Sequence, residues 1–382
     1  MKYGAHALIL IYQSSLLCLN THLEWVIYGA AAMSQQMSVP PLKEQGKRYS
    51  IIFDYLRVFA MFGVLAVHLS QQFPMPGLMK QIAGMGAYCV QIFFVISAYL
   101  GCSYFFRPVA TIGGYYKKRA LRILPTYYAA IVAAMVYIEF FTKGYNPDVF
   151  HLGWVRYFLG LNTILPSVDF WQWNNAFGFW TMTNFIVFYA IIPIVIKKVK
   201  SFKGGAIFFL ICFIISAVAR VLSNLYATPG TYSELDLMIW WSPAVQMQHF
   251  ALGVMTYFAV RDGKQSFAAI ILICFALFPA RICPPPLLFA ILTCLFILSV
   301  KEREVNITGT PRKWLQFVAK YSFHIYLTHL LALAIGQRIA LIFCEPSTLC
   351  FYAAKLIVCI VATILLCCFL ELAQRTANKL FS

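Results

Sequence analysis

Asp54, Arg57 and His68 follow one another in an apolar run, in the order Asp-x-x-Arg-x₁₀-His. At about 100° per residue of an α-helix, the three side chains fall within roughly 60° of one another on one face. Ionisable groups inside a bilayer are costly, so they usually face a bundle interior or an aqueous cavity and mark a functional path. This face is therefore predicted to form the wall of a reaction chamber.

The imidazole of His68 is the predicted catalytic group of that chamber. An imidazole with an ordinary pKa of about 6.5 is able to take a proton from a hydroxyl at neutral pH. Arg57 is predicted to line a channel to this base, and Asp54, one turn earlier, is predicted to hold the guanidinium in place. The sequence leaves open whether His68 activates a second substrate directly or carries the transferred group as a covalent intermediate.

The composition places these residues in a membrane. Hydrophobic residues make up 61% of the 382 residues and charged ones only 11%, and the runs 206–219, 267–280 and 287–300 carry no charge. Such a composition predicts an all-α, polytopic transmembrane helix bundle. The net charge of +17 would suggest nucleic-acid binding in a soluble protein. Here the basic residues gather in short loops between apolar spans, where they set topology, so no nucleic-acid partner is expected.

Hydropathy predicts about ten spans and a single orientation for them. Six loops on one side hold 20 Lys or Arg, whereas the five loops on the other side hold five. This asymmetry predicts a multi-pass protein of the inner (plasma) membrane with both termini in the cytoplasm, with Arg57 near the cytoplasmic face and His68 nearer the outside. The predicted spans are 51–71, 83–106, 121–141, 178–196, 205–223, 243–260, 266–280, 286–300, 316–336 and 350–371.

Three regions are predicted along the chain: an N-terminal extension at 1–48, a membrane domain at 49–373 and a cytoplasmic tail at 374–382. For the extension, the preferred interpretation is that translation starts near Met33 or Met37, or that its first 30 residues form a loosely associated segment.

The twelve cysteines are scattered, mostly inside spans, with no Cys/His spacing that suits zinc. No metal site is expected, and small apolar packing is their predicted role. Cys344 and Cys350 share one outward loop and are expected to pair if that compartment is oxidising.

Arg119 and Arg122 stand three residues apart at the entrance to the third span. Side chains at this spacing project from neighbouring positions on one helix face, and two guanidinium groups are suited to grip a polyanion. At the cytoplasmic mouth they are predicted to bind the phosphates of a soluble donor. The neighbouring Lys117 and Lys118 are interpreted as topogenic charges.

Together these residues resemble the acyltransferase 3 family of integral membrane acyltransferases over most of 51–371. The resemblance implies about ten spans and an O-acyltransferase that uses acyl-CoA from the cytoplasm as co-substrate, with no bound cofactor. It implies transfer of an acyl group, commonly acetyl, to a carbohydrate or glycolipid acceptor at the outer side of the membrane. His68 would be the essential histidine, Arg119 and Arg122 the family's RxxR pair, and Ser97, Tyr99 and His329 supporting residues. The motifs that carry the resemblance are Asp54-x-x-Arg57 with His68, Phe93 to Leu100, Arg119-x-x-Arg122-Ile-x-Pro125, Trp180 with Phe188-Tyr189 and Pro193, Phe250-x-Leu252-Gly253, and Tyr321 to His329.

Two departures from the family pattern stand out. Many relatives carry a glutamate in the span that begins at Trp180, whereas here Thr181 to Ile186 has no carboxylate, which puts any acid or base role of that span in doubt. Ala98 stands where glycine is usual, which is interpreted as a change in packing.

Other polar residues of the spans receive structural interpretations. His249, His324 and His329 are expected to form hydrogen bonds across helices. Arg220, Lys320 and Lys355 are expected to snorkel to lipid headgroups, with an addition to the donor site as an alternative for Lys320. The long outward segment 142–177 carries aromatic, amide and carboxylate groups that suit either sugar binding or anchoring at the interface.

The main alternative function is a transporter or flippase of a glycolipid or organic acid that uses the same buried charges as a translocation path. A structural membrane subunit is less favoured, because buried charges would then have no task. The identity of the acceptor stays open among peptidoglycan, capsule or exopolysaccharide, O-antigen, teichoic acid and a small lipid-linked sugar. Succinyl stays open as an alternative to acetyl.

Overall fold

The computed structural model describes residues 51–141, 153–164, 178–226, 234–300 and 310–381. The chain divides into two units, 1–49 and 50–382. The first unit, with the predicted N-terminal extension, lies outside the described residues, as does most of the predicted outward segment 142–177.

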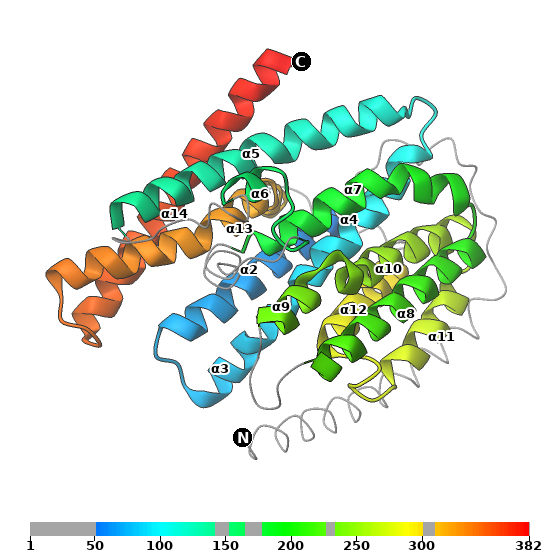
Figure 1. The fold of residues 1–382 in the computed structure, drawn as a ribbon, viewed down its shortest axis with the longest axis horizontal. Coiled ribbons are helices and arrows are strands. Elements are labelled where there is room, and N and C mark those ends of the chain that lie inside the picture. Colours follow the sequence, from blue (N-terminus) through cyan, green and yellow to red (C-terminus); the bar gives the residue numbers. More distant parts are fainter. Residues whose placement is uncertain (1–50, 142–152, 165–177, 227–233, 301–309, 382) are drawn as a thin grey trace. The chain divides into compact units, whose positions relative to one another are not determined.

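The described part of the second unit is all helical (Figure 1). Its helices are α2 (Ile52–Gln72), α3 (Gly77–Gly84), α4 (Val90–Phe105), α5 (Ile112–Phe141), α6 (Val155–Phe158), α7 (Trp180–Lys198), α8 (Phe202–Tyr226), α9 (Glu234–Trp241), α10 (Pro243–Arg261), α11 (Gln265–Ala276), α12 (Pro285–Val300), α13 (Thr310–Phe343) and α14 (Leu349–Phe381), with a 3₁₀ turn, η3 (Met85–Tyr88), before α4.

Each of the ten predicted spans corresponds to a helix, but fewer than ten are fit to cross a bilayer. Among the described residues, seven helical segments are long and apolar enough to do so. With 12 and 16 residues, α11 and α12 are too short, because a bilayer core about 30 Å thick needs roughly 20 helical residues. Polar residues such as Gln246, Gln248 and His249 make α10 less apolar. The expectation of about ten spans is therefore corrected to seven by length and composition, in a helical membrane bundle.

The helices pack in two neighbouring groups (Figure 1). In one group, α13 packs along both α14 and α2, and α14 also packs on α5. In the other, α10 packs against α8, α4 and α12. The contact of α2 with α4 joins the two groups, so that α2 contributes to both.

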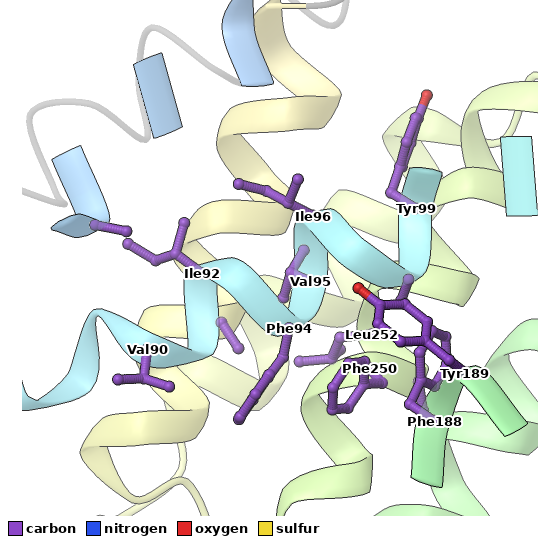
Figure 2. Packing of buried hydrophobic residues seen from close by; sticks show 14 of the residues in the cluster. Val90, Ile92, Phe94, Val95, Ile96, Tyr99, Phe188, Tyr189, Phe250 and Leu252 are labelled. Carbon is purple, nitrogen blue, oxygen red and sulfur yellow. The ribbon is translucent and has the colours of Figure 1, made fainter. Parts of the chain in front are cut away.

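Aromatic rings fill the interface of α4, α7 and α10 (Figure 2). Phe250 lies between Phe94 and Phe188, with ring centroids 4.6 and 4.3 Å away, and all three rings are fully buried. Because lipid tails are as apolar as these rings, close packing rather than escape from water holds such helices together. A Cβ at Gly253 would come 2.3 Å from the carbonyl oxygen of Val95, so the glycine of the Phe-x-Leu-Gly motif permits this approach of α10 to α4.

The outer faces of several helices expose large apolar side chains, as expected for contact with lipid. On α14 these include Ile357, Ile360, Val361, Ile364 and Leu365, each at least half exposed. The same helix continues to Phe381, so residues 374–381 of the predicted tail are helical. Whether that part lies in the cytoplasm stays a prediction.

The turn between α13 and α14 contains the predicted disulfide. Cys344 and Cys350 are bonded, with their Cα atoms 6.1 Å apart. The other cysteines in the described residues are free, and most of them are buried.

Candidate active site

The packing of α13 on α2 brings two histidines together. The ring centroids of His68 on α2 and His329 on α13 lie 5.1 Å apart, with an angle of 46° between the ring planes. His329 is buried, and His68 is half-buried. The residue that the helical face singled out therefore lies beside a second imidazole that is 261 positions away in the sequence.

Hydrogen bonds define which nitrogen of each ring is available as a base. His68 Nδ1 lies 3.1 Å from Gln71 Oε1, and His329 Nδ1 lies 2.6 Å from the carbonyl oxygen of Tyr326. Both partners are acceptors, so each Nδ1 carries the hydrogen and donates it. In the neutral form of each ring, Nε2 then holds the lone pair. The buried Nε2 of His329 has no hydrogen-bond partner in the described part of the chain.

Tyr326 ties this pair to α7. Its hydroxyl donates to Thr181 Oγ1 at 3.1 Å, and Thr181 donates in turn to the carbonyl oxygen of Gly178 at 3.2 Å. Thr181 belongs to the stretch in which the sequence lacks the glutamate of many relatives. Here that stretch contacts Tyr326, whose carbonyl oxygen accepts the hydrogen bond from His329.

An open cavity of about 460 Å³ lies at the end of α2, one turn beyond His68. Gln71, whose side-chain oxygen accepts the hydrogen bond from His68, forms part of its wall. The wall comes from the end of α2, the last turns of α5 and α13, and the first turns of α14. Its polar residues are Gln71, Gln72, Tyr137, Gln337, Arg338 and Lys355.

Asp54 and Arg57 lie toward the opposite end of α2. Arg57 donates to the carboxylate of Asp54 at 3.1 Å, which is the contact that their spacing predicted. Eleven helical residues separate Arg57 from His68, a rise of roughly 17 Å. The structure therefore places the predicted guanidinium and the imidazole on one helix but not in contact.

Arg119 and Arg122 lie near the start of α5. The guanidinium of Arg119 sits over the rings of Tyr115 and Tyr189, 5.5 and 5.1 Å from their centroids. Arg122 is exposed, and its carbonyl oxygen accepts a hydrogen bond from Gln374 of α14 at 3.2 Å. The two residues thus face different surroundings, one aromatic and one at the surface.

Near Arg122, a carboxylate that sequence reasoning missed gathers several cations. Glu371 accepts from Lys320 at 3.1 Å and from Arg375 at 2.9 Å, and its second oxygen lies 3.7 Å from His324 Nε2. We call Lys320, His324, Glu371 and Arg375 the Glu371 cluster. The i, i+4 spacing of Glu371 and Arg375 was a signal for one of these contacts, whereas the other contacts join α13 to α14.

Of the two predicted supporting residues of α4, Tyr99 lies away from the histidine pair. The ring of Tyr99 packs 5.1 Å from that of Phe53 and 5.4 Å from that of Tyr257. Phe53 directly precedes Asp54, so Tyr99 belongs to the Arg57 end of α2. Ser97 is half-buried on the same helix.

Two structural interpretations from the sequence are corrected. Lys355 does not snorkel, because it is only 3% exposed and lines the cavity. The hydrogen bonds of His249 and His329 run to carbonyl groups three residues earlier in the same helix, not across helices. Among the described residues, no three His, Cys, Asp or Glu side chains are grouped to hold a metal ion.

These features define a polytopic membrane protein whose bundle holds an imidazole pair at one end and a basic surface at the other. The chain matches the family model Acyl_transf_3, described as an acyltransferase domain, over residues 51–371. It therefore belongs to this family and is a membrane acyltransferase. No curated protein and no solved structure matches it.

Proposed function

We propose that the protein transfers an acyl group, acetyl in the simplest case, from cytoplasmic acyl-CoA to a hydroxyl of a cell-surface or lipid-linked carbohydrate. The observation that carries the proposal is the position of His68, 5.1 Å from the ring of His329 and hydrogen-bonded to a residue of the cavity wall. A base beside a cavity is what transfer to a bound hydroxyl requires.

In the proposed reaction, Nε2 of His68 takes the proton of the acceptor hydroxyl. The oxygen attacks the carbonyl carbon of the thioester, so that a C–O bond forms and the C–S bond breaks. The proton passes from the imidazole to the departing thiolate, which leaves as CoA. The hydrogen bond from Nδ1 to Gln71 supports this role, because it keeps the lone pair on Nε2. His329 is proposed to orient the ring of His68 and the hydroxyl beside it.

For the donor, the arginines at the other end of the bundle are the proposed binding residues. CoA phosphates do not enter hydrocarbon, so its nucleotide would stay at Arg119 and Arg122 while the thin pantetheine arm reaches past Arg57 toward His68. The charge asymmetry of the loops supports an orientation in which this end faces the cytoplasm of a plasma membrane. The cavity would then open to the outer side.

The test is label transfer from ¹⁴C-acetyl-CoA to surface glycans in membranes that contain His68→Ala or the wild-type protein. We expect the variant to lose at least about 100-fold in rate, the usual contribution of a general base. His249→Ala is the control, since His249 is another histidine of the bundle and lies buried on α10.

Export of the unacylated glycan is measured in the same strains. Unchanged acylation with lost export would refute the proposal in favour of a transporter. Retention of transfer by His68→Ala would refute the role of this histidine.

A further inference from the structure

The cavity beside His68 carries uncompensated positive charge. Its wall includes Lys355 and Arg338 but no carboxylate. Within the described ranges, no Asp or Glu oxygen lies within 4 Å of either cation. Lys355 is buried there without an anion, whereas Arg338 is exposed at the edge of the cavity, so the buried ammonium is the charge that lacks a partner.

Lys355 is held so that its ammonium is available to a ligand. Nζ donates to the carbonyl oxygen of Gln72 at 3.3 Å and lies over the ring of Phe73, 5.0 Å from its centroid. An ammonium has three hydrogens, and one is used by this bond. Burying a charge without an ionic partner is costly, and an anion in the cavity would remove that cost.

The backbone fixes this arrangement. A Cβ at Gly336 would come 2.8 Å from the carbonyl oxygen of Lys355, so α13 and α14 meet closely at this level. Lys355 therefore projects from a closely packed helix pair, and Arg338 lies two residues after Gly336 on α13. The Cys344–Cys350 disulfide closes the turn between the two helices.

One residue, Gln71, links the cavity to His68. Gln71 lines it and accepts the hydrogen bond from His68, and a volume of about 460 Å³ is within the range of small-molecule sites. A sugar with one charged substituent fits this description. Its anionic group would meet Lys355 and Arg338 while one of its hydroxyls reaches His68.

We propose that the acceptor carries an anionic group, a carboxylate or a phosphate, and that Lys355 and Arg338 bind this group in the cavity. The inference rests on the proposed function, because it assigns the cavity to the acceptor. It narrows the acceptor to acidic sugars, such as uronic acids and sugar phosphates.

The test measures ligand binding by calorimetry, with the full-length protein in phosphatidylcholine nanodiscs. The probes are methyl glucuronide, glucose 1-phosphate and the neutral methyl glucoside. We expect one or both anions to bind at least about tenfold more tightly than methyl glucoside, since hydrogen bonds to charged groups are the stronger ones. Lys355→Met and Arg338→Gln should each abolish this preference, and Lys355→Arg should keep it.

Lys379→Met is the matched control, because Lys379 lies exposed near the far end of the same helix, and it should bind like the wild type. Equal binding of the three probes, no binding of either anion, or an unchanged preference in both cavity variants would refute the inference. Loss of methyl glucuronide binding on adding phosphatidylglycerol would assign the cavity to a lipid phosphate and refute it as well.

Failure of the proposed function would look different. His68→Ala should keep the anion preference while acyl transfer is lost. A wild-type protein that binds the anions but supports no acyl transfer in its own membranes would refute the proposed function and leave the anion site in place.

Discussion

At the Arg57 end of the bundle, two carboxylates of the protein itself meet cations. Arg57 pairs with Asp54, and Glu371 accepts from both Lys320 and Arg375. At the His68 end, the buried Lys355 meets a carbonyl oxygen and aromatic faces instead. Both ends lie on the same helices, so the difference is one of chemistry rather than of fold.

This contrast separates two uses of buried charge. A cation that is paired across helices links two elements of the protein, as Lys320 of α13 does with Glu371 of α14. A cation without an anionic partner is set up to receive one from outside. The same division applies to the histidines, because His324 faces a carboxylate whereas His329 faces another imidazole.

The largest expected effect compares these two histidines. His329→Ala should lower the rate of labelled acetyl transfer by about 100-fold, because the ring that orients His68 and the acceptor hydroxyl is lost. His324→Ala should change it by less than about threefold, since the Glu371 cluster takes no part in the transfer step. Transfer is measured in membranes at matched expression. Equal losses of transfer rate in the two variants would mean that the two ends of the bundle do not differ in their role in acyl transfer.

A second comparison concerns stability. Glu371→Gln should reduce the free energy of unfolding by about 2 kcal/mol, because it leaves His324, Lys320 and Arg375 facing one another without an anion. This value is lower than for a fully buried pair, since the side chains of Lys320 and Arg375 are 56% and 65% exposed.

Lys355→Met should change the same free energy by less than about 1 kcal/mol, because no carboxylate loses its partner. Thermal unfolding of Glu371→Gln and Lys355→Met in the same detergent measures both changes in the free energy of unfolding. A loss for Lys355→Met as large as for Glu371→Gln would mean that the charge of Lys355 is already balanced within the protein.

The sequence predicted the local part of this structure well. Apolar runs located the helices, and the three-residue spacing of Asp54 and Arg57 anticipated their contact. The number of spans was overestimated where apolar runs are cut short. The run predicted as 266–280 ends as a helix at Ala276, shortly before Pro279, which cannot donate a helical hydrogen bond.

The non-local part of the site was beyond a single sequence. His68 and His329 meet only because α13 packs on α2, and hydropathy does not tell which helices are neighbours. The snorkelling expected of Lys355 assumed a lipid-facing position, whereas the close approach of α14 to α13 at Gly336 buries it. The family motif includes His329, but the sequence gave no indication that its side chain lies beside His68.

The smallest expected effect concerns the link from α7 to His329. Thr181→Val removes the side-chain acceptor of the Tyr326 hydroxyl and should cost about 1 kcal/mol of stability. Because the carbonyl of Tyr326 holds His329 Nδ1, we also expect acyl transfer to slow by about threefold to tenfold.

Thr183→Val is the matched control on the same helix. Thr183 donates to Asn162 at 2.6 Å, so its loss should cost similar stability without slowing transfer. Transfer rates and unfolding temperatures of the two variants distinguish positioning from general stability, and Thr181→Ser should restore the rate. If both valine variants slow transfer equally, the hydroxyl of Tyr326 contributes to folding alone, and the orientation of His329 depends on its own helix and on His68.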